Sequence, residues 1–143
     1  MRSNPRRLVA DAYPWAVAPE TRFADMDINH HLNNVAVARL YEESRVRFHA
    51  HIRATWPEIG QPHSFIAHLE IDYLAEGRYP APVAIGLATL SLGRSSYRIG
   101  MGLFQSGHCI GLCDAVLVHR DGTGPAPIPP VLRDVLGEFT FRA

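Results

Sequence analysis

A short polar segment, residues 25 to 34, carries the side chains whose types and spacing could do chemistry. Three apolar residues, Met26, Ile28 and Leu32, stand there among polar ones, which are Asp25, Asp27, Asn29, His30, His31, Asn33 and Asn34. A carboxylate in such a segment can attack a carbonyl carbon or activate a water molecule. A helix that begins directly after the segment would supply free N–H groups to stabilise the resulting oxyanion. These residue types therefore predict attack on a carbonyl group.

Asp27 is the predicted nucleophile or general base of this segment. We expect the backbone N–H near Asn34 to polarise the carbonyl group. The side chains of Asn29 and His31 are expected to orient the water or the carboxylate. The competing interpretation of Asp27 is structural, because most aspartates before a helix cap it or brace a loop. For Asn33 and Asn34, helix capping is the stronger interpretation.

The run from Arg22 to Asn34, with Tyr41-Glu42-Glu43-Ser44-Arg45 in the helix after it, resembles the N-terminal signature of the 4-hydroxybenzoyl-CoA thioesterase-like hotdog family. In that signature an aspartate two residues after another aspartate precedes Gly-His-Val-Asn-Asn at the start of the central helix. The matching positions here are Asp27, His31, Leu32, Asn33 and Asn34. The resemblance implies an α+β hotdog fold, with an antiparallel five-stranded sheet wrapped around one long central helix. It also implies an acyl-CoA thioesterase, and it favours a catalytic Asp27.

A second resemblance leaves the carrier of the acyl group open. The pattern Asp27-x-Asn29-x-His31-x-Asn33-Asn34, with Glu43-Ser44 downstream, is similar to the active-site stretch of acyl-carrier-protein thioesterases. Those enzymes usually carry two hotdog units per chain, whereas this chain has room for one. His30 stands where the first family commonly has glycine, so we expect its side chain to narrow the acyl-binding mouth. His30 and Asn33 are therefore predicted to contact substrate.

A tight turn at Arg94, Ser95 and Ser96 is the second candidate for substrate binding. Related thioesterases often have a Gly-Arg-Ser-Ser-like stretch near the phosphates of the coenzyme. The guanidinium group of arginine suits phosphate through its fork of N–H donors. An ordinary surface turn explains the same residues equally well.

The two histidines of the polar segment also raise the question of a metal site. His30 and His31 adjoin Asp25 and Asp27. A zinc site needs a further ligand in tetrahedral geometry, and the sequence indicates none. We therefore expect no metal and no cofactor, because coenzyme A would be part of the substrate.

The elements that must position these residues follow from hydrophobic periodicity. We predict a strand over residues 15 to 23 and then one amphipathic helix over residues 33 to 50. Four strands and a short helix follow, at residues 65 to 73, 83 to 92, 96 to 105, 109 to 120 and 131 to 136. Alternation in the first of these four predicts one apolar face, which comprises Phe65, Ala67, Leu69, Ile71 and Tyr73. Such a meander is expected to form an antiparallel sheet that buries one face under the helix.

The overall composition fits one globular domain over residues 1 to 143, with 47% apolar and 20% charged residues. Acidic and basic residues number 14 each, so a nucleic acid is not an expected partner. No apolar run suits a signal peptide or a membrane span, which predicts a cytoplasmic protein without membrane contact. Cys109 and Cys113 are expected on one face of a strand, about 13 Å apart and too distant for a disulfide.

Two other functions remain open from the sequence, and the assembly is predicted by resemblance. Hotdog hydratases, which act on enoyl-CoA, also combine aspartate, asparagine and histidine, but they resemble Asp-x-Asn-Pro-x-His, with a proline that is absent here. A non-catalytic module that binds acyl-CoA is the other alternative. The resemblance implies a homodimer with the pocket between subunits, or a dimer of dimers, and an exposed sheet edge would need such cover.

Overall fold

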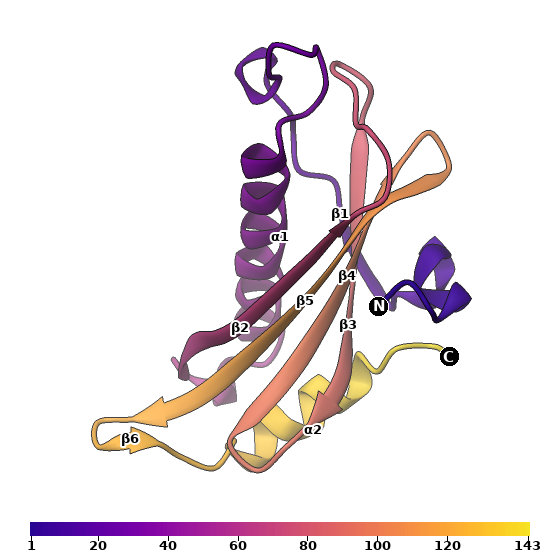
Figure 1. Cartoon of the computed structure of the whole chain (residues 1–143). Coiled ribbons are helices and arrows are strands. Elements are labelled where there is room, and N and C mark those ends of the chain that lie inside the picture. Colours follow the sequence, from indigo (N-terminus) through magenta and orange to yellow (C-terminus); the bar gives the residue numbers. More distant parts are fainter.

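One antiparallel sheet with a long helix across one face makes up most of the chain, which the computed structural model describes over residues 1–143 (Figure 1). The strands are β1 (Trp15–Val17), β2 (His63–Tyr73), β3 (Val83–Leu92), β4 (Ser96–Gln105), β5 (His108–Asp121) and β6 (Gly124–Pro125). The helices are α1 (Asn34–Thr55) and α2 (Pro130–Glu138), with 3₁₀ turns at Pro5–Leu8, Ala10–Ala12, Phe23–Asp25 and Pro57–Ile59. The strand order is β1-β3-β4-β5-β2, and β6 pairs with β5. The predicted α+β class is confirmed, and the short β6 is an additional strand.

Helix α1 begins where the sequence predicts, because Asn33 caps it. The side-chain oxygen of Asn33 accepts a hydrogen bond from the N–H of Val35 at 2.8 Å. The residues that α1 buries recur at helical spacing and are Ala36, Val37, Leu40, Tyr41, Ser44, Phe48 and Ile52. The helix continues past the predicted end at residue 50 to Thr55, and Pro57 then prevents its continuation. No helix of the chain combines the length and hydropathy needed to cross a membrane.

The long strands lie close to their predicted bounds, whereas the first strand is shorter. Strands β3 and β4 have the bounds that periodicity predicts, and β2 and β5 differ from prediction only at their ends. The prediction of a strand over 15 to 23 was wrong beyond Val17. Pro19 has no N–H group to donate to a neighbouring strand, and the chain leaves the sheet before it.

A β-bulge changes the predicted apolar face of β2. The register with β5 shifts between Ile66 and His68, so that Ala67 is left unpaired. Ile66 lies beside Leu117 and Ile71 beside Cys113, both of which belong to the main core. Phe65 therefore points to the opposite face, and the prediction that it shares a face with the other apolar residues was wrong.

A second bulge separates the two cysteines. Phe104 pairs with Cys109 and Leu103 with Gly111, which leaves Ile110 as the extra residue of β5. Cys113 lies in the core under α1, whereas Cys109 packs beside a smaller cluster on the other face. The expectation that both thiols share one face was therefore wrong. Burial raises the pKa of the Cys113 thiol to about 12, which suits a small apolar core residue.

The N-terminal segment covers the face of the sheet opposite α1 (Figure 1). Tyr13 lies directly over Gly86, where an added Cβ would come within 2.7 Å of the tyrosine Cβ. Arg7 enters the same layer, and its guanidinium group donates a 2.7 Å hydrogen bond to Asp114 of β5. Both side chains of this ion pair are buried. The N-terminal segment and α1 therefore cover opposite faces of the sheet.

Candidate functional site

A cavity of about 250 Å³ opens at the N-terminal end of α1. Its lining residues are Asp27, Asn29, His31, Leu32, Asn34, Val37, Tyr73, Ala75, Glu76, Gly77, Leu103 and Ile110. The structure thus brings the four residues predicted to be catalytic, Asp27, Asn29, His31 and Asn34, to one cavity. Leu32 of the polar segment and Val37 of α1 also line it, and the remaining side chains come from β2, β4, β5 and the loop after β2. The polar segment alone therefore does not form this cavity.

Asp27 is held at the cavity by a closed turn of its own segment. Its N–H donates to the carbonyl oxygen of His31 at 3.0 Å, and its carbonyl oxygen accepts from the N–H of His30 at 3.0 Å. The carboxylate oxygen Oδ1 accepts a hydrogen bond from the N–H of Asn29 at 2.8 Å. The other oxygen, Oδ2, accepts none from the protein. A half-buried carboxylate oriented through one oxygen has the other available for a water or a carbonyl carbon.

His30 occupies the tip of this turn and does not line the cavity. Its φ is 60°, in the left-handed region that favours glycine. This backbone conformation explains physically why the 4-hydroxybenzoyl-CoA thioesterase-like family commonly has glycine at this position. The imidazole is exposed, so within one chain it does not narrow the cavity as predicted.

The start of α1 leaves an N–H donor free at a residue that lines the same cavity as Asp27. Asn33 is the N-cap, its side chain takes the N–H of Val35, and its own N–H donates to the Asp25 carbonyl at 2.7 Å. Asn34 is the first helical residue, so its N–H has no carbonyl partner within the helix. Asn34 also lines the cavity, whereas Asn33 does not. The geometry therefore supports capping by Asn33 and an oxyanion donor at the Asn34 N–H.

Glu76 is a residue of the cavity that the sequence analysis missed. Its carboxylate lies 3.0 Å from Nε2 of His31. The loop of Glu76 is tied to the polar segment because the N–H of Leu32 donates to the Gly77 carbonyl at 2.8 Å. A Cβ at Gly77 would come within 2.7 Å of Leu32 Cδ1, so any larger residue there would force the Leu32 side chain to shift. No local pattern marks Glu76, because its partner lies far away in the sequence.

Tyr73 reaches the same helix start from the end of β2. Its hydroxyl group donates a 2.9 Å hydrogen bond to the carbonyl oxygen of Asn34. The tyrosine therefore fixes the first turn of α1 against β2 while its ring forms part of the cavity wall. The sequence placed Tyr73 on an apolar strand face and gave no indication of this contact.

Asp25 braces the segment and is turned to other partners. Its side chain is buried, and Oδ1 accepts hydrogen bonds from the guanidinium groups of Arg22 and Arg39. Oδ2 accepts from the Arg22 N–H at 2.8 Å. Burial alone would raise the pKa of Asp25, but these hydrogen bonds hold that pKa below its ordinary value. The chain gathers no group of three or more His, Cys, Asp or Glu side chains that could hold a metal ion.

The turn at Arg94, Ser95 and Ser96 lies at the other end of the sheet. Leu103 of β4 lines the cavity, and Ser96 begins the same strand seven residues earlier. At the rise of a β-strand, the two residues are about 23 Å apart. The Arg94 carbonyl oxygen accepts the N–H of Ile128 at 2.9 Å, so the turn contacts the segment before α2. Within one chain, a phosphate contact at Arg94 would need a ligand that spans this distance. The predicted role of the turn stays a prediction.

Comparisons with known protein families and solved structures identify proteins that are similar to this chain. The family model described as the thioesterase-like superfamily matches residues 21–136. A thioesterase of Thermus thermophilus, whose crystal structure contains coenzyme A and zinc, is 33% identical, with a TM-score of 0.76. The match covers 87% of this chain and 98% of that one. No curated protein matches the sequence.

Two further solved structures have the same fold. A protein of Pseudomonas aeruginosa is 27% identical, with a TM-score of 0.79, and the match covers 95% of this chain and 97% of that one. A 1,4-dihydroxy-2-naphthoyl-CoA thioesterase of Synechocystis has a TM-score of 0.73 over 87% of this chain and 96% of its own. Its identity is 12%, so this likeness concerns the fold alone. The predicted hotdog architecture is confirmed.

Proposed function

The chain belongs to the thioesterase-like superfamily, and we propose that it hydrolyses an acyl-CoA to a free acid and coenzyme A. Thioester hydrolysis follows from the family, whereas the acyl-CoA substrate and the mechanism are our proposal. The observation that carries it is the half-buried carboxylate of Asp27 in one cavity with the N–H of Asn34 at the start of α1. An attacking or base group and an oxyanion donor are what acyl transfer requires.

In the proposed mechanism, Oδ2 of Asp27 faces the thioester carbonyl carbon, directly or through one water. In the general-base route the carboxylate takes a proton from that water, whose oxygen bonds to the carbon. In the nucleophilic route Oδ2 itself bonds to the carbon, and water then hydrolyses the anhydride. In both routes the N–H of Asn34 holds the oxyanion, the C–S bond breaks, and the sulfur leaves as a thiolate that gains a proton.

The acyl carrier is tested by offering the same acyl group on coenzyme A and on an acyl carrier protein. We expect the larger kcat/KM for the coenzyme A ester, measured as thiol release. A panel of short, long and aromatic acyl-CoAs then defines the acyl preference. Loss of the conjugated absorbance of an enoyl-CoA would instead favour a hydratase. Tight binding of acyl-CoAs without turnover would favour a binding module.

The imidazole of His31 is proposed to orient the reacting water, with Glu76 as its positioning residue. We expect Glu76→Gln to lower kcat about tenfold with little change in KM, because the amide keeps the shape but not the charge beside His31. Steady-state kinetics over a range of pH would measure both constants. Glu58→Gln, at an exposed glutamate outside the cavity, is the matched control. Equal kcat values for Glu76→Gln and the parent protein would exclude the positioning role.

A homodimer built on the free edge of β2 is the proposed assembly. β2 pairs with β5 on one side only, and its exposed apolar side chains are Phe65, Ile66, Leu69 and Tyr73. An exposed, long and apolar edge strand is a surface that a second strand covers. The partner subunit would then adjoin the cavity, because Tyr73 belongs to both the edge and the cavity wall. We also propose that the protein is cytoplasmic.

The substitution Leu69→Lys should convert this dimer to monomers. Leu69 is 45% exposed, and a lysine in the middle of a strand pair would bring two like charges together across the molecular dyad. Sedimentation velocity measures the change, and thiol release should fall with it. Val131→Lys, at a residue 40% exposed on α2, is the control that should stay dimeric. If the Leu69→Lys protein sediments as the parent protein does, the β2 edge is not the interface.

A further inference from the structure

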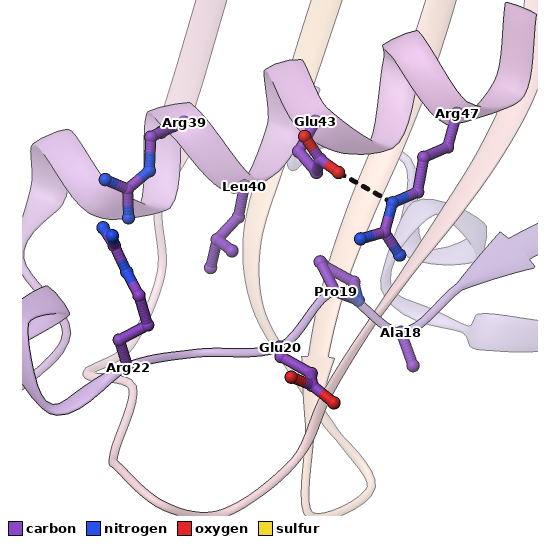
Figure 2. A pocket seen from close by; sticks show the side chains of 8 residues that line it. All are labelled: Ala18, Pro19, Glu20, Arg22, Arg39, Leu40, Glu43 and Arg47. Carbon is purple, nitrogen blue, oxygen red and sulfur yellow. Dashed lines mark hydrogen bonds and ion pairs between the residues drawn. The ribbon is translucent and has the colours of Figure 1, made fainter. Parts of the chain in front are cut away.

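A second hollow, separate from the Asp27 cavity, is lined by three arginines. It has a volume of about 430 Å³ and lies between α1 and the chain segment before it (Figure 2). Its lining residues are Ala18, Pro19, Glu20, Arg22, Arg39, Leu40, Glu43 and Arg47. None of them lines the Asp27 cavity. The proposed hydrolysis does not use this hollow.

Two of the arginines converge on a single carboxylate oxygen. The guanidinium groups of Arg22 and Arg39 point toward each other and lie close together (Figure 2). Both donate to Oδ1 of Asp25, whose side chain is only 2% exposed. The arginine side chains themselves are 61% and 51% exposed. Two like charges are thus held close together at the wall of an open hollow.

The charges around the hollow leave the arginine pair partly uncompensated. Arg47 is neutralised by Glu43, to which its Nε donates at 2.8 Å. Glu20 makes no ion pair, and its carboxylate turns away from α1 and from the arginines (Figure 2). Asp25 therefore supplies one negative charge for the two positive charges of Arg22 and Arg39. An anion in the hollow would relieve this excess.

We propose that this hollow is a binding site for a phosphate group, held by Arg22 and Arg39 with Arg47 at its far side. Each guanidinium group has five N–H donors. The pair with Asp25 uses one side-chain N–H of Arg22 and one of Arg39. The remaining donors form forks that match the oxygens of a phosphate. The hollow is large enough for a phosphate with part of the molecule that carries it.

The site connects to the polar segment through Asp25. The carboxylate of Asp25 binds the two arginines, and its carbonyl oxygen accepts the N–H of Asn33, the cap of α1. The phosphate could belong to the coenzyme of a thioester substrate or be free in solution. The proposal does not depend on the thioesterase mechanism, because it rests on the arginines and their charges alone.

Calorimetric titration with inorganic phosphate, coenzyme A and dephospho-coenzyme A tests the site on the full chain. We expect phosphate to bind the parent protein in chloride buffer and to bind about tenfold more weakly to Arg47→Gln and to Arg39→Lys. Arg39→Lys keeps a positive charge beside Asp25, so the fold should be retained, and a circular dichroism melt checks this. The substitution loses only the fork of guanidinium N–H donors that would bind phosphate. Arg120→Gln, at an exposed arginine outside the hollow, should bind as the parent does.

The results of these titrations show whether the bound phosphate belongs to coenzyme A or is free in solution, and whether the site exists. Competition between coenzyme A and inorganic phosphate, lost in the arginine variants, assigns the site to the coenzyme. Phosphate binding without such competition assigns it to free phosphate. No binding of any probe at millimolar concentration, or equal binding by the parent and both variants, overturns the site. Thiol release measured in parallel is a separate result, because a chain can bind phosphate here and fail to hydrolyse, or the reverse.

Discussion

Asp27→Asn is expected to lower thiol release from an acyl-CoA by about a thousandfold or more, with the fold unchanged. An asparagine keeps the side-chain shape and an Oδ1 that can accept the N–H of Asn29, which lies 2.8 Å from the carboxylate in the parent protein. It loses the negative charge that attacks carbon or removes a proton from water. Initial rates with a saturating acyl-CoA and a thiol reagent measure the effect.

The control for this substitution is Asp134→Asn, at an exposed aspartate of α2 away from the cavity. It should release thiol at the rate of the parent protein. Circular dichroism melts of both variants separate loss of chemistry from loss of structure. A folded Asp27→Asn protein that hydrolyses as fast as the parent protein would remove Asp27 from the mechanism.

A single turnover in water labelled with oxygen-18 distinguishes the two roles of Asp27. If the carboxylate is the nucleophile, water that attacks the anhydride at the aspartyl carbon leaves the label in Asp27. If it is a general base, the label appears in the released acid, and the protein stays unlabelled. Mass spectrometry of the peptide that contains Asp27 provides the measurement.

Asp114→Ala is expected to lower the free energy of unfolding by about 3–5 kcal/mol, the largest stability effect that we predict. The Arg7 and Asp114 side chains are 5% and 7% exposed, and the pair is joined at 2.7 Å. Removal of the carboxylate leaves the guanidinium group of Arg7 buried without its counter-charge. Tyr13, which accepts from Nε of Arg7 at 3.0 Å, does not replace that charge. Urea denaturation followed by tryptophan fluorescence measures the difference.

Two comparisons test the reason for this loss. Asp72→Ala removes a carboxylate whose partner Arg2 is 66% exposed, so it should leave the free energy of unfolding nearly unchanged. The double substitution Arg7→Met with Asp114→Leu should recover most of the loss, because Arg98, the second partner of Asp114, is 38% exposed and no fully buried charge is left unpaired. A double variant as unstable as Asp114→Ala would contradict an electrostatic origin.

The elements that could be predicted from the sequence are those whose signals are local. The start of α1 followed from Asn33, because a cap uses only the N–H groups of the first turn. The bounds of β3 and β4 followed from alternation between turn residues. The polar segment from Asp25 to Asn34 indicated chemistry because so many polar side chains stand together before a helix. These features depend on residues that are neighbours in the chain.

The distant residues that contact this segment could not be predicted from local patterns, because packing brings them there. Glu76 reaches His31, and Tyr73 reaches Asn34, through a loop and a strand whose positions depend on pairing with β5. The bulge at Ala67 moved Phe65 to the other face, because one unpaired residue reverses the alternation that periodicity predicts. Periodicity describes one strand at a time, whereas register and long-range contacts arise only when strands, loops and helix pack together.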